Sequence, residues 1–211
     1  MSFVFDIRRV LGGFALIVIS VLSPVHAETY VEISTSNSHS CALLASGGVQ
    51  CWGVNDDGQL GNGTNTDSST PVAVSGITTA TSVSAGSFHT CALLASGGVQ
   101  CWGFNSSGQL GNGTASPSST PVAVSGITTA SSMAVGGNHS CARLASGGVQ
   151  CWGFNGSGQL GNGTTSPSST PVAVSGLATA TSVAAGGSHS CARLASGGVQ
   201  CWGSKDRKSV V

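Results

Sequence analysis

A block of fifty residues recurs along this chain without insertions, and it constrains the fold more than any other feature of the sequence. Its most regular part holds one histidine, two cysteines and the tripeptide Cys-Trp-Gly. Equivalent histidines and tryptophans lie fifty residues apart, at His39, His89, His139 and His189 and at Trp52, Trp102, Trp152 and Trp202. A repeat of this length is typical of propellers and solenoids, in which each unit packs against its neighbours.

Each block begins with two short runs of residues around a glycine turn. In the second block, residues 91–94 and 99–102 alternate between two faces, which is the period of a β-strand. The turn at residues 95–98 contains two glycines, which accept the positive φ that a short hairpin loop requires. A hairpin centred on this turn places Cys91 directly opposite Cys101, on the same side of the strands. We therefore predict an antiparallel hairpin with facing cysteines in every block.

The first 27 residues have the pattern of a secretory signal peptide. Arg8 and Arg9 give a positive start, residues 10–22 form an apolar segment, and a small-residue cleavage region ends at Ala27. The apolar segment is shorter than the roughly 20 residues of a membrane-spanning helix, which disfavours an uncleaved anchor. We expect a secreted or periplasmic protein with no membrane span after cleavage.

All eight cysteines follow the predicted signal peptide, so they would meet an oxidising compartment where disulfides persist. Eight cysteines can pair in many ways, but the hairpin register selects the pairing within each block. Zinc is the competing interpretation, and the separation of ten residues differs from the short spacing of zinc sites. We therefore predict no metal and no cofactor, and four disulfides: Cys41–Cys51, Cys91–Cys101, Cys141–Cys151 and Cys191–Cys201.

The rest of each block also predicts short strands and turns. Residues 108–114 combine glycines with Asn-Gly and mark a compact turn. Residues 120–126 predict a strand with Pro121 near its start, where a missing N–H costs little. Residues 132–136 predict another strand that leads into the next hairpin. About four short strands per block match the size of a propeller blade and predict an all-β fold.

These residues resemble the regulator of chromosome condensation repeat family in its bacterial exported, cysteine-containing form. The specific run is Trp-Gly-x-Asn-x-x-Gly-Gln-Leu-Gly, which recurs at 52–61, 102–111 and 152–161. The other matching residues are the stretch 89–103, the turn 108–114 and Pro121-Val122. The resemblance covers essentially all of the chain after the signal peptide, and it implies a β-propeller of seven blades.

The chain departs from that family pattern in its repeat count. It has four cysteine hairpins but three Gln-Leu-Gly turns, or about 3.5 repeats. We expect a partial propeller, open or half, rather than a full seven-bladed ring. An open arc leaves sticky strand edges, so a homodimer that completes one ring is a further expectation. The predicted divisions are a signal peptide (1–27), tandem repeats (28–203, as 28–80, 81–130, 131–180 and a partial 181–203) and a charged tail (204–211).

Several functional classes fit the composition poorly. Only 7% of the residues are charged and the formal net charge is zero, so the basic surface that holds nucleic acid is missing. No carboxylate recurs beside the histidines to orient a general base, and the pair Asp56-Asp57 occurs in one block only. We expect a non-enzymatic protein with histidines that bond backbone in turns, rather than a ligand ring. We expect the tryptophans to fill the space between blades rather than to stack on sugars.

Positions that differ between nearly identical blocks indicate where the surface is free to change. One such position reads Leu43, Leu93, Arg143 and Arg193, and we expect it to reach solvent. Turn residues on one rim are where a propeller usually varies its binding. The candidate binding rim consists of Val54, Phe88, Phe104, Asn138, Phe154 and Ser188.

The favoured function is a secreted or periplasmic scaffold that binds an unidentified protein or cell-surface partner. The resemblance implies this function, because related exported propellers include a β-lactamase inhibitor. An enzyme inhibitor and a carbohydrate-binding propeller are alternatives within the same class. A guanine-nucleotide exchange factor or GTPase regulator is the alternative by family analogy, because the eukaryotic namesake acts on the Ran GTPase. A cell-wall hydrolase would need a clustered acidic pair.

Overall fold

The computed structural model describes residues 28–204, and the predicted signal peptide and nearly all of the charged tail lie outside them. The described residues form β-strands, turns and loops without a helix. The strands make four antiparallel sheets. Sheet 1 contains β1 (Tyr30–Thr35), β2 (His39–Leu44), β3 (Val49–Gly53) and β4 (Ser68–Ala73). Sheet 2 contains β5 (Ala80–Ala85), β6 (His89–Leu94), β7 (Val99–Gly103) and β8 (Ser118–Ala123). Sheet 3 contains β9 (Ala130–Val135), β10 (His139–Leu144), β11 (Val149–Gly153) and β12 (Ser168–Ala173). Sheet 4 has three strands, β13 (Ala180–Ala185), β14 (His189–Leu194) and β15 (Val199–Gly203).

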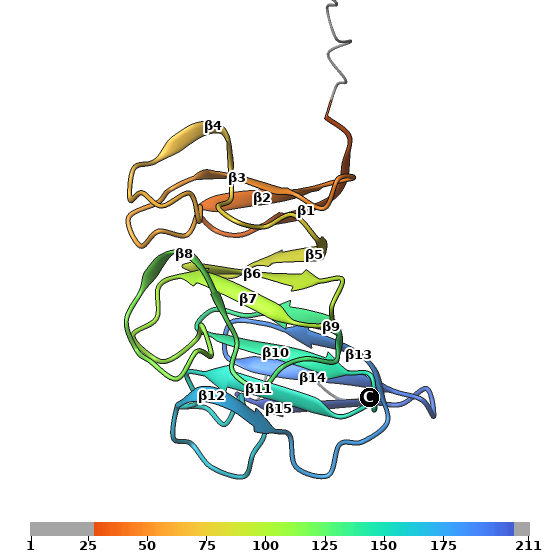
Figure 1. The fold of residues 1–211 in the computed structure, drawn as a ribbon. Coiled ribbons are helices and arrows are strands. Elements are labelled where there is room, and N and C mark those ends of the chain that lie inside the picture. Colours follow the sequence, from red (N-terminus) through yellow and green to blue (C-terminus); the bar gives the residue numbers. More distant parts are fainter. Residues whose placement is uncertain (1–27, 205–211) are drawn as a thin grey trace, which may run out of the picture.

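The sheets follow one another in chain order and stack face to face (Figure 1). Within each sheet the strands also follow chain order, so every connection joins neighbours. The first strands of the sheets contact one another, since β1 packs on β5, β5 on β9 and β9 on β13. The described sheets do not close into a ring. The fold is therefore all-β and forms part of a propeller, as the repeat count predicts.

The predicted hairpin register is present in all four sheets. Cys91 lies opposite Cys101 in β6 and β7, and the glycine turn between them has Gly97 at φ 81°. The amide of Gly97 donates to the carbonyl of Leu94, which closes the turn. Each hairpin has the disulfide that its register predicts, and the four bonds are Cys41–Cys51, Cys91–Cys101, Cys141–Cys151 and Cys191–Cys201.

Both faces of an inner sheet are covered. We call the face with the cysteines the disulfide face; in sheet 2 it carries His89, Cys91, Leu93, Val99 and Cys101. The opposite face is the Trp face, and in sheet 2 it carries Thr90, Ala92 and Trp102. The hydrophobic core between sheets 1 and 2 joins the disulfide face of sheet 1 to Ala92 and Trp102 of sheet 2. The same arrangement recurs at the next two junctions.

This stacking contradicts the expectation that position 43 and its equivalents reach solvent. Leu43 and Leu93 are only 4% and 6% exposed, because the next sheet covers the disulfide face. The half-buried Arg143 extends across the junction and donates from Nε to the carbonyl of Ala180. Arg193 is the exposed member of the set, because no described sheet follows sheet 4. A junction that accepts leucine or arginine thus explains the variation at this position.

Candidate binding surface

A histidine of each of the first three sheets bonds the next sheet. Nε2 of His89 lies 2.8 Å from Oγ of Ser140, and that hydroxyl donates to the carbonyl of Gln109 at 3.1 Å. His39 with Thr90, and His139 with Ser190, repeat the arrangement at 2.8 Å. The expectation that these histidines bond backbone was wrong, because the stacking brings in a side chain 51 residues further along.

These contacts fix the protonation of the histidines. The Ser140 hydroxyl has a single proton and donates it to Gln109, so it accepts the Nε2–H of His89. Burial, together with the neighbouring His139 and His39, lowers the pKa of His89 from 6.5 to about 3. Burial lowers the pKa of His39 and of His139 to about 4. The rings are therefore neutral near pH 7, and each Nε2 already has a partner within the fold.

The tryptophans fill the junctions, as predicted. Trp102 and Trp152 are fully buried, and their Nε1–H groups donate to the carbonyls of Gln59 and Gln109 at 2.9 Å. The approach is close, because a Cβ on Gly111 would lie 2.7 Å from the Trp152 ring. The first tryptophan, Trp52, has no preceding sheet among residues 28–204 and is half-buried.

The recurring polar loop after each of the first three hairpins is also bonded internally. Nδ2 of the buried Asn55 donates to the carbonyls of Thr64 and Thr66, and its Oδ1 accepts from the amide of Leu60. Asn105 and Asn155 repeat these bonds. The recurring polar residues thus build the repeat. Among the described residues, no group of three or more His, Cys, Asp or Glu side chains could hold a metal ion.

The candidate rim residues lie together at one end of the sheets. The amide of Phe104 donates to the carbonyl of Phe88 at 3.0 Å, and the amide of Phe154 donates to that of Asn138 at 2.8 Å. The predicted rim positions Val54 and Ser188 belong to equivalent backbone pairs in sheets 1 and 4, with Ser38 and Ser204 as partners. This end of the stack carries the long β3–β4, β7–β8 and β11–β12 loops, at the left of Figure 1.

Three phenylalanines give this rim an apolar surface. Phe88 is 45% exposed and Phe154 is 39% exposed, while Phe104 is half-buried. The rings of Phe88 and Phe104 meet edge to face, with centroids 6.1 Å apart and an angle of 68° between their planes. Phe154 packs over Gly156, where a Cβ would lie 2.6 Å from the ring. We call the four backbone pairs with these rings the aromatic rim.

A shallow hollow lies at the same end, where the turns between the first two strands of the sheets meet. It has a volume of about 260 Å³ and is lined mainly by glycine, serine and alanine, such as Ser87, Gly137 and Gly187. Asn37 also lines it. Sequence reasoning did not identify these turn residues or Ser38. The signal was available for Ser38, because it occupies the same repeat position as Phe88.

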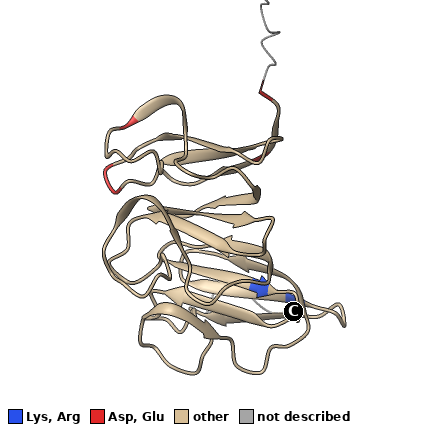
Figure 2. Ribbon diagram, in the orientation of Figure 1, with Lys and Arg blue, Asp and Glu red and all other residues tan. Residues whose placement is uncertain are grey.

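Charge is unevenly distributed over the stack (Figure 2). All described carboxylates belong to the first repeat, whereas the described arginines are Arg143 and Arg193 in sheets 3 and 4. Asp56 and Asp57 follow Val54 in the loop at the rim end, where Asp56 is exposed and Asp57 is half-buried. Partial burial and the neighbouring Asp56 raise the pKa of Asp57. The rim is thus acidic at sheet 1 and aromatic at sheets 2 and 3.

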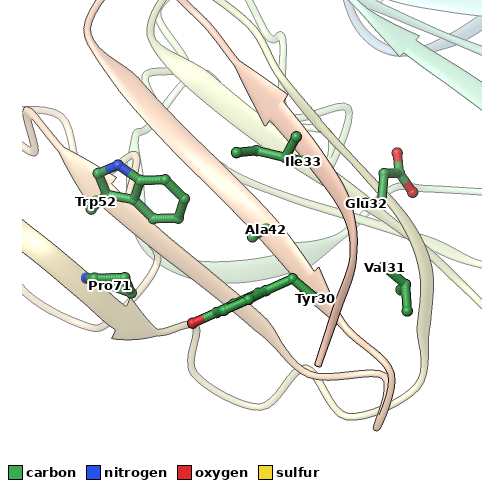
Figure 3. A pocket seen from close by; sticks show the side chains of 7 residues that line it. All are labelled: Tyr30, Val31, Glu32, Ile33, Ala42, Trp52 and Pro71. Carbon is green, nitrogen blue, oxygen red and sulfur yellow. The ribbon is translucent and has the colours of Figure 1, made fainter. Parts of the chain in front are cut away.

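The outer Trp face of sheet 1 forms a second candidate surface (Figure 3). An open pocket of about 460 Å³ lies on it, lined by Tyr30, Val31, Glu32, Ile33, Ala42, Trp52 and Pro71. Tyr30 and Ile33 are 48% and 63% exposed. Their equivalents in sheet 2, Ala80 and Val83, are buried. The sequence predicted exposed strand edges that favour association, but it did not identify the outer Trp face of sheet 1.

Comparison with family models identifies the repeat. A model described as the regulator of chromosome condensation (RCC1) repeat matches residues 46–93, 96–143 and 146–193. A second model of the same description matches residues 30–59, 80–109, 130–159 and 180–207. The chain belongs to the RCC1 repeat family. RCC1-repeat propellers typically serve as non-enzymatic scaffolds for interactions.

Several solved structures share the fold. The chain is similar to human WBSCR16, with 25% identity and a TM-score of 0.76 over 86% of this chain and 50% of that one. It is similar to yeast RCC1 (Prp20) bound to Kap60, with 22% identity and a TM-score of 0.75 over 83% and 44%. The ectodomain of the Physcomitrella patens receptor kinase CR4 gives 26% identity and a TM-score of 0.54 over 86% and 42%. The chain spans about half the length of these proteins or less.

Proposed function

We propose that this protein is an exported, non-enzymatic scaffold that binds a protein or cell-surface partner through the aromatic rim. The observation that carries the proposal is the gathering of exposed Phe88 and Phe154 with Phe104 on one rim of an otherwise nearly identical set of repeats. The recurring histidines, tryptophans and asparagines bond within the fold, which leaves the varied rim positions as the surface that distinguishes one sheet from the next.

The chemistry of the rim favours a protein partner. Exposed aromatic rings supply large contact area at low entropic cost and are enriched in protein interfaces. The acidic pair Asp56-Asp57 lies at the sheet 1 end. We therefore propose a partner segment with an apolar centre and a basic flank.

The site of action follows from the disulfides. Four disulfides indicate an oxidising compartment, because the reducing cytosol does not maintain them. Among residues 28–204 no helix is long and apolar enough to cross a membrane. Export through the predicted signal peptide completes the proposal. Catalysis forms no part of it, since the histidine rings of the first three sheets are buried and bonded.

Site-specific photocrosslinking in cells tests this function. A photoreactive phenylalanine analogue replaces Phe88 or Phe154 on the rim, or Ser96, which is exposed in the hairpin turn at the opposite end of sheet 2. We expect the two rim positions to crosslink to the same partner and Ser96 to give no such product. Absence of a rim-specific product, or an equal yield from Ser96, would contradict the proposal.

A further inference from the structure

The first and last sheets present the two halves of a junction that the chain forms three times internally. On the Trp face of sheet 1, Ser40 and Trp52 are half-buried, whereas the equivalent Thr90 and Trp102 of sheet 2 are fully buried against sheet 1. The exposed Ile33 corresponds to Val83, which is 2% exposed. The outer face of sheet 1 thus has the residues of a junction without a sheet packed on it.

The disulfide face of sheet 4 is the complementary half. Val199 is 53% exposed, whereas the equivalent Val49, Val99 and Val149 are each 2% exposed. The cysteines of the first three bridges are almost completely buried. Cys201, by contrast, is exposed. The fourth disulfide therefore lacks the alanine and tryptophan cover that the next sheet gives to the others.

The internal junctions define which residues would meet. Each junction histidine bonds a hydroxyl 51 residues further along, as His139 bonds Ser190. If the stack continued from sheet 4 into sheet 1 of a second copy, the hydroxyl in the equivalent place for His189 would be that of Ser40 in this second copy. Likewise, Arg143 donates to the carbonyl of Ala180 in the next sheet. The equivalent acceptor for Arg193 would be the carbonyl of Tyr30 in the second copy.

Charge supports the same pairing. Glu28 lies two residues before Tyr30, and one of its carboxylate oxygens accepts a bond from Gln50 on the Trp face of sheet 1. Arg193 is exposed on the disulfide face of sheet 4 and bonds Oγ1 of Thr181 in its own sheet. An acidic first face and a basic last face attract when two copies align head to tail.

We propose that the disulfide face of sheet 4 binds the Trp face of sheet 1 of a second copy of this chain. The contact is heterologous, so it closes into a ring or extends as an open chain. Two copies contribute eight sheets, so a two-copy ring has one sheet more than the seven-bladed ring expected from the repeat count. This surface is separate from the aromatic rim, so the inference goes beyond the proposed function.

The new junction is weaker than the internal ones. Trp102 donates to the carbonyl of Gln59, which belongs to the Gln-Leu-Gly turn of the preceding sheet. Sheet 4 has no equivalent turn among its described residues, which end at Ser204. Among the described residues of sheet 4, Trp52 of the second copy therefore finds no equivalent acceptor. The contact between copies should consequently dissociate on dilution, while the internal junctions stay intact.

Sedimentation equilibrium of the purified, disulfide-bonded full chain tests the inference. We expect wild type to shift from monomer to dimer or larger species as concentration rises. Ile33→Glu places a charge in the contact and should weaken assembly by more than about tenfold, because burying an unpaired charge is costly. Phe154→Glu, an exposed apolar residue on the rim, is the matched control and should assemble like wild type. A monomer at all concentrations, or equal assembly by Ile33→Glu, would overturn the inference.

Reduction of the fourth disulfide gives an independent readout. A mild reductant followed by thiol alkylation and mass measurement reports the exposure of Cys201. In wild type, reduction of this bridge should slow several-fold as the protein concentrates, whereas in Ile33→Glu the rate should stay constant. If the Cys191–Cys201 bridge is already fully protected from reduction in the dilute monomer, another segment of the same chain covers it. That result would overturn the inference. Retention of the three buried bridges shows that the variant is folded.

Discussion

The repeats provide a matched pair of substitutions that isolates the value of one junction contact. His89→Ala removes a fully buried ring whose Nε2 bonds Ser140. His189→Ala removes the same residue type from a half-buried site, where the ring has no hydrogen bond among the described residues. The two substitutions thus differ mainly in whether a following sheet packs on the histidine.

The structure sets the size of the difference. The lost hydrogen bond costs about 1 kcal/mol and the cavity left by the ring costs about 2 kcal/mol. Nδ1 of His89 is buried without a partner, and removing it returns about 1 kcal/mol. We therefore expect His89→Ala to lower the free energy of unfolding by about 2 kcal/mol, and His189→Ala by less than about 0.5 kcal/mol.

Urea unfolding followed by tryptophan fluorescence measures this difference. With a slope near 2 kcal/mol per molar urea, the midpoint of His89→Ala should fall by roughly 1 M. The midpoint of His189→Ala should stay close to that of wild type. Equal shifts for the two variants would refute the assignment of the histidine to the junction between sheets.

Three further predictions follow from the packing. In a dilute sample, mild reductant should open the Cys191–Cys201 bridge before the other three, which thiol alkylation and mass measurement would detect. The buried histidines have pKa values lowered from 6.5 to about 4 or below, so the unfolded chain takes up their protons first as the pH falls. Stability should be fully present above pH 6.5 and fall below it by roughly 1.4 kcal/mol per histidine per pH unit, as urea titrations at several pH values would show. Gly111→Ala should destabilise by at least about 2 kcal/mol more than Gly163→Ala, because both have positive φ but only Gly111 lies against Trp152.

The sequence predicted those parts of the fold that depend on local pattern. The period of two and the glycine turn were sufficient to place Cys91 opposite Cys101, and hence to pair the cysteines. The repeat period predicted the packing of Trp102 between sheets, because a large apolar ring in a repeat needs a neighbour to cover it.

The contacts between sheets were harder to predict, because they join residues about fifty positions apart. The partner of His89 depends on which face of the next sheet turns toward it, and no pattern within one block encodes that choice. Leu43 was misjudged because its equivalents include arginine, although Arg143 fits the junction by bonding a carbonyl of the next sheet. The aromatic rim was proposed from variation alone; the structure adds that Phe88 and Phe104 are backbone partners with touching rings.

Capture of a partner by paired variants tests the central claim, that the aromatic rim is the binding surface. The experiment measures how much partner each immobilised protein retains from the same extract of the cell envelope and its surroundings. The proteins compared are wild type, the double variant Phe88→Ser/Phe104→Ser, and Ile33→Glu. The account predicts that wild type and Ile33→Glu retain the same partner, while the double rim variant retains less than about a tenth of it, since removing central aromatic residues typically costs more than 1.4 kcal/mol. Equal retention by the double rim variant, with its disulfides intact, would contradict the account.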